Sequence, residues 1–149
     1  MRIALYQPEI AGNVGTILRT SACFGIAVDI IEPCGFAFSQ RALRRAGMDY
    51  IDPALITRYA DWQSFASSLG TARQILFSSK GTQSHTDFSF RPSDILLFGS
   101  EGAGVPAEVH DSANARVRIP MKTGMRSLNL AVSVAIALGE ALRQIEGYP

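Results

Sequence analysis

The chain has 149 residues, a length typical of one domain, and 47% of them are hydrophobic, enough for a substantial core. The formal net charge of +1 does not indicate a nucleic-acid-binding protein, so any RNA surface must depend on local basic clusters. Cys23 and Cys34 lie in or beside apolar runs without a preceding signal peptide, which favours two buried thiols in a cytoplasmic protein. Neither a metal site nor a membrane span is predicted, because ligand spacing is missing and charges interrupt the C-terminal apolar segment.

The first half of the chain alternates runs typical of strands with runs typical of helices. Residues 2–6 form a β-like run that ends before Pro8, which cannot donate to a sheet ladder. Residues 14–24 carry apolar side chains at helical spacing and stop at Gly25. Four elements then follow in order: a strand at 28–31, a short basic helix with Ser39 as its N-cap, a strand at 54–59, and a helix at 62–69 between Asp61 and Gly70.

The second half begins with two continuous apolar runs, 74–78 and 94–98, typical of parallel strands covered on both faces. The polar stretch 79–92 between them predicts a loop. Pro106 fits the first turn of a short helix through His110, and 116–119 is a sixth strand. Six strands alternating with helices predict an α/β fold with an open, mostly parallel sheet, right-handed crossovers and flanking helices.

The last long segment is almost wholly apolar. Within residues 128–142 the polar side chains are Asn129, Ser133 and Glu140, and Ser127 is the predicted N-cap. A helix that is apolar nearly all round must be buried on most of its faces. Its own sheet could cover it, or a second copy of the protein could do so. If a second copy does, replacing Leu138 with Glu should weaken the dimer.

Three loops follow predicted strands, at 12–19, 99–106 and 120–129, and ligands of open α/β sheets bind beyond the carboxyl ends of strands. The glycines of the second loop permit close approach to a flat ligand, but a tight structural turn explains them equally well. Glu101 could act on a ligand, although accepting hydrogen bonds from loop amides is the commoner role of such a carboxylate. Ser127 is either simply the N-cap of the long helix or, together with Asn129, part of a helix end that offers unpaired amides and polar side chains to a ligand.

Basic residues form two clusters that are either solvated faces or phosphate-contacting surfaces. The first comprises Arg41, Arg44 and Arg45, and the second comprises Arg116, Arg118, Lys122 and Arg126. Arg19 stands apart from both clusters, and a lone Arg on a helix usually faces solvent or pairs with an acid.

Together the three loops resemble the motifs of the SPOUT methyltransferases. The matching segments are Asn13-Val-Gly-Thr-Ile-Leu-Arg19-Thr, Leu97-Phe-Gly-Ser-Glu-Gly-Ala-Gly, and Ile119-Pro-Met through Ser127-Leu-Asn-Leu. Three further segments are similar to the small, single-domain tRNA (cytidine/uridine-34 2′-O)-methyltransferases: Ile31-Glu-Pro-Cys-Gly-Phe-Ala, Leu43-Arg-Arg-Ala-Gly-Met-Asp-Tyr and Lys80-Gly-Thr. The chain departs from that subgroup at Ala131-Val132, where many members have Ser-Asn, and at Gly139, where they have an aromatic residue.

The resemblance implies one domain over residues 1–149, a C-terminal trefoil knot, and a homodimer packed partly through the last helix. It implies methyl transfer from S-adenosyl-L-methionine, without a metal, to the ribose 2′-hydroxyl of the wobble pyrimidine of tRNA, with leucine tRNAs as the expected substrates. Two alternatives stay open: a different tRNA or rRNA ribose, and a non-catalytic RNA- or nucleotide-binding module.

The resemblance also assigns site residues. Those expected at the cofactor are Phe77, Gly99, Glu101, Gly102, Ile119, Met121, Ser127 and Leu128. Asn13 and Arg19 are expected to be catalytic, with the partner subunit as one source of Arg19. Because a guanidinium is a poor base, we interpret Arg19 as positioning a phosphate or the developing alkoxide. The residues expected to bind RNA are Arg41, Arg44, Arg45, Lys122 and Arg126.

Overall fold

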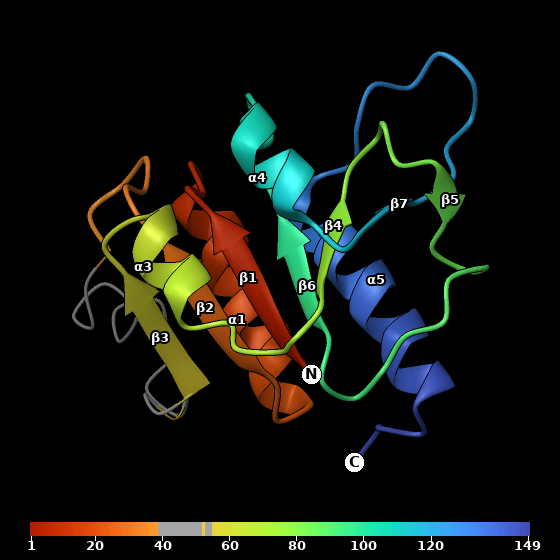
Figure 1. The fold of residues 1–149 in the computed structure, drawn as a ribbon, viewed down its shortest axis with the longest axis horizontal. Coiled ribbons are helices and arrows are strands. Elements are labelled where there is room, and N and C mark those ends of the chain that lie inside the picture. The colour runs from red at the N-terminus through yellow and green to blue at the C-terminus, as the bar shows by residue number, and fades with distance from the viewer. Residues whose placement is uncertain (39–51, 53–54) are drawn as a thin grey trace.

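The computed structural model describes residues 1–38, 52 and 55–149 (Figure 1). Within this part of the chain, seven strands form one sheet in the order β3-β2-β1-β6-β4-β7-β5, and every neighbouring pair is parallel. Their bounds are β1 Arg2–Tyr6, β2 Ala27–Ile31, β3 Ile56–Tyr59, β4 Gln74–Phe77, β5 Gln83–Ser84, β6 Ile95–Phe98 and β7 Ala115–Arg118. The six predicted strands are confirmed, and the sheet has one strand more than predicted.

The additional strand, β5, lies in the stretch predicted to be a loop. It has only two polar residues, too few for any periodicity to reveal, and it pairs with the edge of β7. Gly81 makes this pairing possible, because a Cβ there would lie 2.4 Å from the carbonyl carbon of Val117. The Arg118 guanidinium donates to the carbonyl oxygens of Gly81 (3.0 Å) and Thr82 (2.8 Å) and fixes the same turn.

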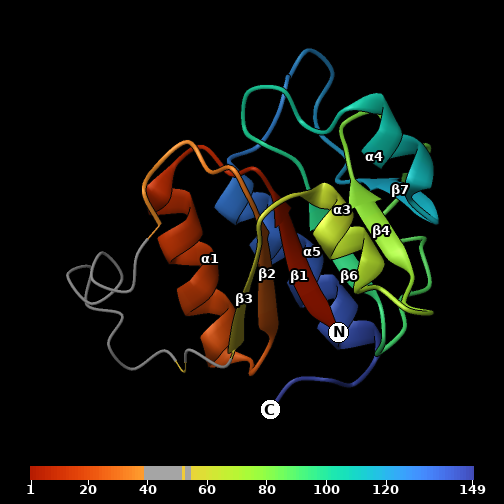
Figure 2. The same cartoon turned by 60° about the vertical axis from the view of Figure 1, so that its left-hand side comes forward.

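Helices cover both faces of the sheet. On one face lie α1 (Ala11–Cys23) and α5 (Leu130–Gln144), and on the other lie α3 (Trp62–Ser67) and α4 (Ala107–Ser112) (Figures 1 and 2). Strand β6 alternates between the two cores: Leu96 and Phe98 pack with α1 and α5, whereas Ile95 and Leu97 pack on the opposite side. Its continuous apolar run is therefore explained by burial on both faces. The predicted basic helix after Ser39 falls outside the described residues.

Several predicted helix ends are confirmed, and two need correction. The Asp61 carboxylate accepts the Ser64 N–H at 2.7 Å and caps α3 as predicted, and Gly25 adopts a φ of 66° after α1. Pro106 is the N-cap of α4 and precedes its first turn. Ser127 does not cap α5, because the N-cap is Asn129, whose Oδ1 accepts the N–H groups of Ala131 (2.9 Å) and Val132 (3.3 Å).

One face of α5 is buried and the other is exposed. Seven residues face the protein's own core: Leu130, Ala131, Val134, Ala137, Leu138, Ala141 and Leu142. On the outer face, Val132 is 46% exposed and Ile136 is 38% exposed. The protein's own core thus accounts for only part of the apolar surface that the sequence gives to this helix.

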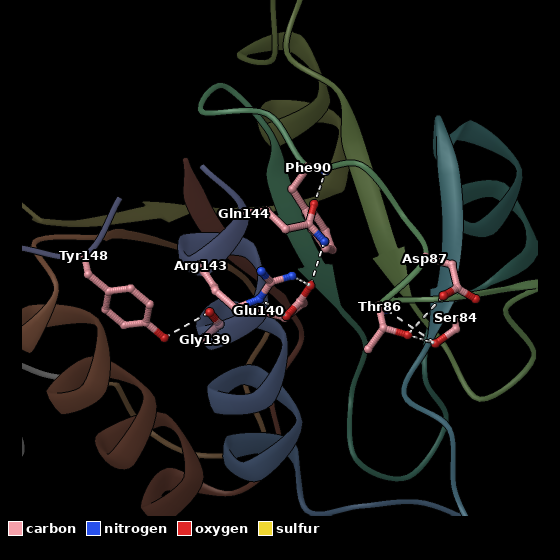
Figure 3. Close-up of polar contacts among 9 residues, drawn as sticks. All are labelled: Ser84, Thr86, Asp87, Phe90, Gly139, Glu140, Arg143, Gln144 and Tyr148. Carbon is pink, nitrogen blue, oxygen red and sulfur yellow. Dashed lines mark hydrogen bonds and ion pairs between the residues drawn. The ribbon is translucent and has the colours of Figure 1, made fainter. Parts of the chain in front are cut away.

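Polar contacts tie the C-terminal end of α5 to its surroundings (Figure 3). Glu140 accepts hydrogen bonds from Arg143 at 2.9 and 2.8 Å, and these together with a bond from Gln144 lower the pKa of Glu140 to about 2. Gln144 in turn accepts the Phe90 N–H at 3.0 Å, and the Tyr148 hydroxyl donates to the Gly139 carbonyl at 2.9 Å.

Two further sequence-based expectations can be checked against the fold. Cys34 is partly buried, but Cys23 is exposed at the end of α1, so the prediction that it is buried is wrong. Position 23 follows the buried Ser21 by two residues, which turns it to the outer side of the helix. None of the helices in the described residues has the length and apolar character needed to cross a membrane.

Asp29 generates a prediction about pH and stability. It is a buried residue of β2, and its carboxylate lies 3.1 Å from the Arg2 guanidinium. Burial raises the pKa of Asp29 to about 6, although Arg2 acts in the opposite direction. Because the folded state holds this proton more tightly than the unfolded state, Asp29 makes the free energy of unfolding fall as pH rises from about 4 to about 6. We expect Asp29→Asn to lose this dependence.

Urea denaturation of wild type and Asp29→Asn at pH 5, 6 and 8 measures the difference. The wild type should lose more stability than the variant between pH 5 and pH 8. A constant difference between the two proteins at all three pH values would contradict the raised pKa.

Candidate active site

The carboxyl ends of β4, β6 and β7 open onto a pocket of about 970 Å³. Its walls come from the start of α1, the segments after β4 and β6, and the segment between β7 and α5, which arches above the sheet in Figure 1. The pocket is lined by all eight residues expected at the cofactor: Phe77, Gly99, Glu101, Gly102, Ile119, Met121, Ser127 and Leu128. Parallel strands bring these segments together although they are far apart in sequence.

The loop after β6 folds back on itself to form one wall. Ser100 and Gly104 exchange two backbone hydrogen bonds, of 2.9 and 3.0 Å. A Cβ on Gly99 would lie 2.4 Å from the carbonyl carbon of Gly104, and Gly104 itself has a φ of 71°. These glycines therefore serve a tight turn, and that turn presents its backbone to the pocket.

Glu101 extends from this loop towards the start of α1. Its Oε1 accepts a hydrogen bond from Asn13 Nδ2 (2.9 Å) and its Oε2 accepts the Glu9 N–H (2.8 Å). Burial acts to raise the pKa of Glu101, but these hydrogen bonds outweigh it and hold the pKa below its ordinary value. A carboxylate whose charged form is stabilised in this way is a weak general base. The structure thus favours the hydrogen-bonding role over a role in proton removal.

Asn13 continues the network from α1 to α5. The side chain is only 8% exposed, and its Oδ1 accepts a hydrogen bond from Asn129 Nδ2 at 2.9 Å. Since Asn129 also caps α5, a chain of side chains runs from Glu101 through Asn13 to the first turn of that helix. One residue from each of the three sequence motifs takes part in it.

Comparison with known proteins agrees with this arrangement. Residues 1–139 match the SpoU rRNA Methylase family. The chain belongs to this family. A relative from Beijerinckia indica is 54% identical, over 96% of this chain and 91% of its own length. Another, from Escherichia coli K12, is 41% identical, over 100% of this chain and 96% of its own length. Both are named tRNA (cytidine(34)-2′-O)-methyltransferase.

Two solved structures extend the comparison. One concerns the 2-OH methylation of C/U34 on tRNA; it is 40% identical and has a TM-score of 0.89 over 98% of this chain and 96% of that one. The other is an AdoMet-bound rRNA methyltransferase from Sinorhizobium meliloti, 28% identical with a TM-score of 0.82. It matches 95% of this chain and 55% of its own, so the SpoU fold here corresponds to about half of that protein.

Arg19 does not line the pocket of the chain to which it belongs. It lies on the exposed side of α1, and the pocket lining contains Asn13 without it. Six residues along a helix give a rise of about 9 Å and a rotation of about 240°, so the two side chains leave α1 in different directions. The expected pair of catalytic residues in this SpoU protein is thus divided between a pocket and an outer surface.

The basic clusters are divided as well. Arg126 lines the pocket, and Lys122 is exposed on the same segment. Arg116 donates to the carbonyl oxygens of His110 and Asp111, and Arg118 holds the turn before β5, so both have structural roles. Three further residues expected to bind RNA lie outside the described residues: Arg41, Arg44 and Arg45.

Two members of the network were not foreseen. Asn129 stood out only as a polar residue at the start of a helix, and no sequence signal joined it to Asn13, which is 116 positions away. Glu9 gave no signal at all, yet its backbone donates to Glu101 and its carboxylate accepts the Gly102 N–H at 3.1 Å. Both interactions depend on the parallel pairing of β1 with β6 and on the return of α5 beside α1.

The network predicts energetic coupling between Asn13 and Asn129. Asn13→Ala removes a donor to Glu101 and an acceptor for Asn129, and should lower the free energy of unfolding by about 1–3 kcal/mol. The double variant with Asn129→Ala should be less destabilised than the sum of the single variants, by about 1 kcal/mol. Urea denaturation of the four proteins measures this coupling. Strict additivity would mean that the hydrogen bond between the two amides contributes nothing.

Proposed function

We propose that this protein transfers a methyl group from S-adenosyl-L-methionine to the ribose 2′-hydroxyl of nucleotide 34, the wobble pyrimidine, in tRNA. The observation that carries the proposal is the pocket at the carboxyl ends of β4, β6 and β7, which all three motif segments line. The names of the relatives support the choice of substrate. Leucine tRNAs are the substrates we expect.

The pocket residues suit the cofactor chemically. Phe77, Ile119 and Leu128 offer apolar surface, and the loop from Gly99 to Gly104 offers backbone groups at close range. Apolar walls with a few polar groups are typical of sites for flat organic ligands. When bound, S-adenosylmethionine supplies an electrophilic methyl group. The task of the protein is to orient the ribose hydroxyl for in-line attack, and that orientation can supply much of the acceleration.

Arg19 is proposed to act on the RNA and not as a base. A guanidinium is a poor base, and its planar donors match a phosphate or an alkoxide. Glu101 is a weak base because its pKa is lowered. The hydroxyl proton therefore passes to water or to a substrate phosphate, while Arg19 stabilises the negative oxygen. Asn13 supports this geometry by holding the start of α1 against the cofactor loop.

We further propose that two copies pair through the outer face of α5. Val132 and Ile136 lie exposed on this face, and Leu128, which precedes the helix, is also exposed and lines the pocket. A second copy laid on this stripe would bury it and bring exposed residues of the partner near the pocket mouth. Arg19 on the outer side of α1 would then be available to the site of the other subunit.

The remaining expectations are proposals of the same kind. We propose that residues 1–149 form one methyltransferase domain that works in the cytoplasm, and the trefoil knot stays a prediction from the family resemblance. Lys122 and Arg126 are proposed to contact RNA phosphates on the segment above the pocket. Arg41, Arg44 and Arg45 are proposed to extend that surface.

The first test is methylation of tRNA. The purified protein, incubated with S-adenosylmethionine and unmodified tRNA, should produce 2′-O-methylcytidine or 2′-O-methyluridine, and nucleoside mass spectrometry detects both. Arg19→Ala should reduce turnover about a hundredfold, because correct orientation of the hydroxyl is lost. Arg91→Ala, at an exposed arginine near the amino ends of the strands, is the matched control and should keep normal turnover.

Five other results would each change part of the proposal. Detection of a methylated purine ribose would mean that the enzyme methylates another position in tRNA or rRNA. Cofactor binding without methylation of any RNA would refute the proposed substrate, and failure to bind the cofactor would leave the non-catalytic RNA- or nucleotide-binding module. Normal turnover by Arg19→Ala would refute the role of Arg19, and full activity of Arg19→Lys would exclude a planar, two-pronged contact.

The dimer gives a prediction that separates surface from core. Ile136→Glu places a charge on the exposed face of α5 and should yield a folded monomer in sedimentation velocity, with reduced methylation. Gln63→Glu, on exposed α3, is the matched control and should stay dimeric. Leu138→Glu, which the sequence favoured, is the wrong variant: Leu138 is 0% exposed, so a charge there should cost over about 4 kcal/mol and unfold the subunit. A fully active Ile136→Glu monomer would refute the shared site.

A further inference from the structure

Glu9 lies in the short segment between β1 and α1, and its backbone is held on two sides. Gln7, two residues earlier, has a φ of 46°, a conformation uncommon for a residue with a side chain, and it turns the chain out of the sheet. The neighbouring loop packs directly against the turn: the Gly35 N–H donates to the Pro8 carbonyl at 2.9 Å. A Cβ on Gly35 would lie 2.8 Å from Glu9 Cα. The backbone of Glu9 is therefore held in place.

Glu9 makes two hydrogen bonds to the loop after β6, one as a donor and one as an acceptor. Its N–H donates to Glu101 Oε2 at 2.8 Å, and its own Oε2 accepts the Gly102 N–H at 3.1 Å. The carboxylate occupies the space beside Gly102 that a side chain would need, since a Cβ there would lie 3.1 Å from Glu9 Oε2. Both halves of the contact depend on residues more than 90 positions away.

The loop that Glu9 holds is the wall of the pocket. Its internal hydrogen bonds between Ser100 and Gly104 set its shape, but they do not set its position relative to the sheet. Among the described residues, side-chain hydrogen bonds to Glu9 and Asn13 connect it to the start of α1. Glu9 does not line the pocket, so it acts on a bound ligand only through the loop.

We propose that Glu9 is a positioning residue for the methyl donor: it holds the loop at Gly102 so that the turn presents its backbone to the cofactor. This inference rests on the proposed function and adds a residue to its site. The required property of the side chain is an acceptor of the right length, because the contact is one hydrogen bond to a backbone amide. Glutamine can replace that acceptor, whereas alanine cannot.

The test compares Glu9→Ala, Glu9→Gln and wild type by calorimetric titration with S-adenosylmethionine. Loss of the charged acceptor should weaken binding by Glu9→Ala about tenfold, and Glu9→Gln should recover most of the loss. In the tRNA assay, Glu9→Ala should raise KM for S-adenosylmethionine while kcat at saturating cofactor stays close to wild type. Glu146→Ala, at an exposed glutamate near the C-terminal end, is the control and should bind normally.

Amide hydrogen exchange supplies a readout that does not depend on the cofactor. The Gly102 N–H should exchange faster in Glu9→Ala than in wild type, whereas the Gly104 N–H, bonded within the loop, should be unchanged.

Each result decides something different. Equal cofactor affinity of wild type and Glu9→Ala would overturn the proposal for Glu9 while leaving the proposed function intact. Equal weakening in Glu9→Gln and Glu9→Ala would overturn the acceptor role. No binding by wild type would refute the proposed function itself, and an unchanged Gly102 exchange rate would then show that the contact with Glu9 does not hold the loop either.

Discussion

The hydrogen bond between Asn13 and Glu101 joins the start of α1 to the loop after β6. Asn13 is buried, and a buried amide without partners is costly, so the fold must supply both a donor and an acceptor for it. Glu101 accepts from its Nδ2, and Asn129 donates to its Oδ1. These two hydrogen bonds hold the start of α1, the loop after β6 and the start of α5 against one another.

Charge follows from the same contact. The N–H groups that donate to Glu101 favour the ionised form of its carboxylate. The neutral amide of Asn13 then connects this carboxylate to Asn129 at the start of α5 without a second charge. The negative group lies near the start of α1, where unpaired N–H groups favour an anion. This arrangement keeps a carboxylate beside the pocket while leaving it little tendency to take up a proton.

The sequence predicted what depends on neighbours in the chain. The strands were predicted from apolar runs, and the cap by Asp61 was predicted from one residue and the helix that follows it. Prediction from the sequence failed where a contact between distant residues determines the structure. Strand β5 exists because Gly81 and Arg118 meet across 37 positions, and Asn129 caps α5 in place of Ser127 at a site where Asn13 is its partner. The apolar pattern suggested that α5 is covered by its own sheet or by a second copy of the protein, but it could not say which face of the helix each would cover.

The candidate site shows the same division. The resemblance named eight of the residues that line the pocket, because motif order survives in a linear sequence. It grouped Asn13 with Arg19, yet helix geometry directs them to different surfaces. Glu9 escaped notice because its contacts are a backbone N–H and one carboxylate oxygen, and neither requires a recognisable pattern of neighbouring residues.

The closed turn from Gly99 to Gly104 also affects how a ligand binds to the pocket and leaves it. Its hydrogen bonds form within the protein alone, so the conformational entropy lost in ordering this wall is lost when the chain folds and not when a ligand arrives. A ligand that contacts this wall gives up little affinity to its ordering, and departure of the ligand requires no unfolding of the wall. As far as this wall is concerned, the residence time of a ligand then depends on the contacts that the ligand makes and not on reordering of the loop.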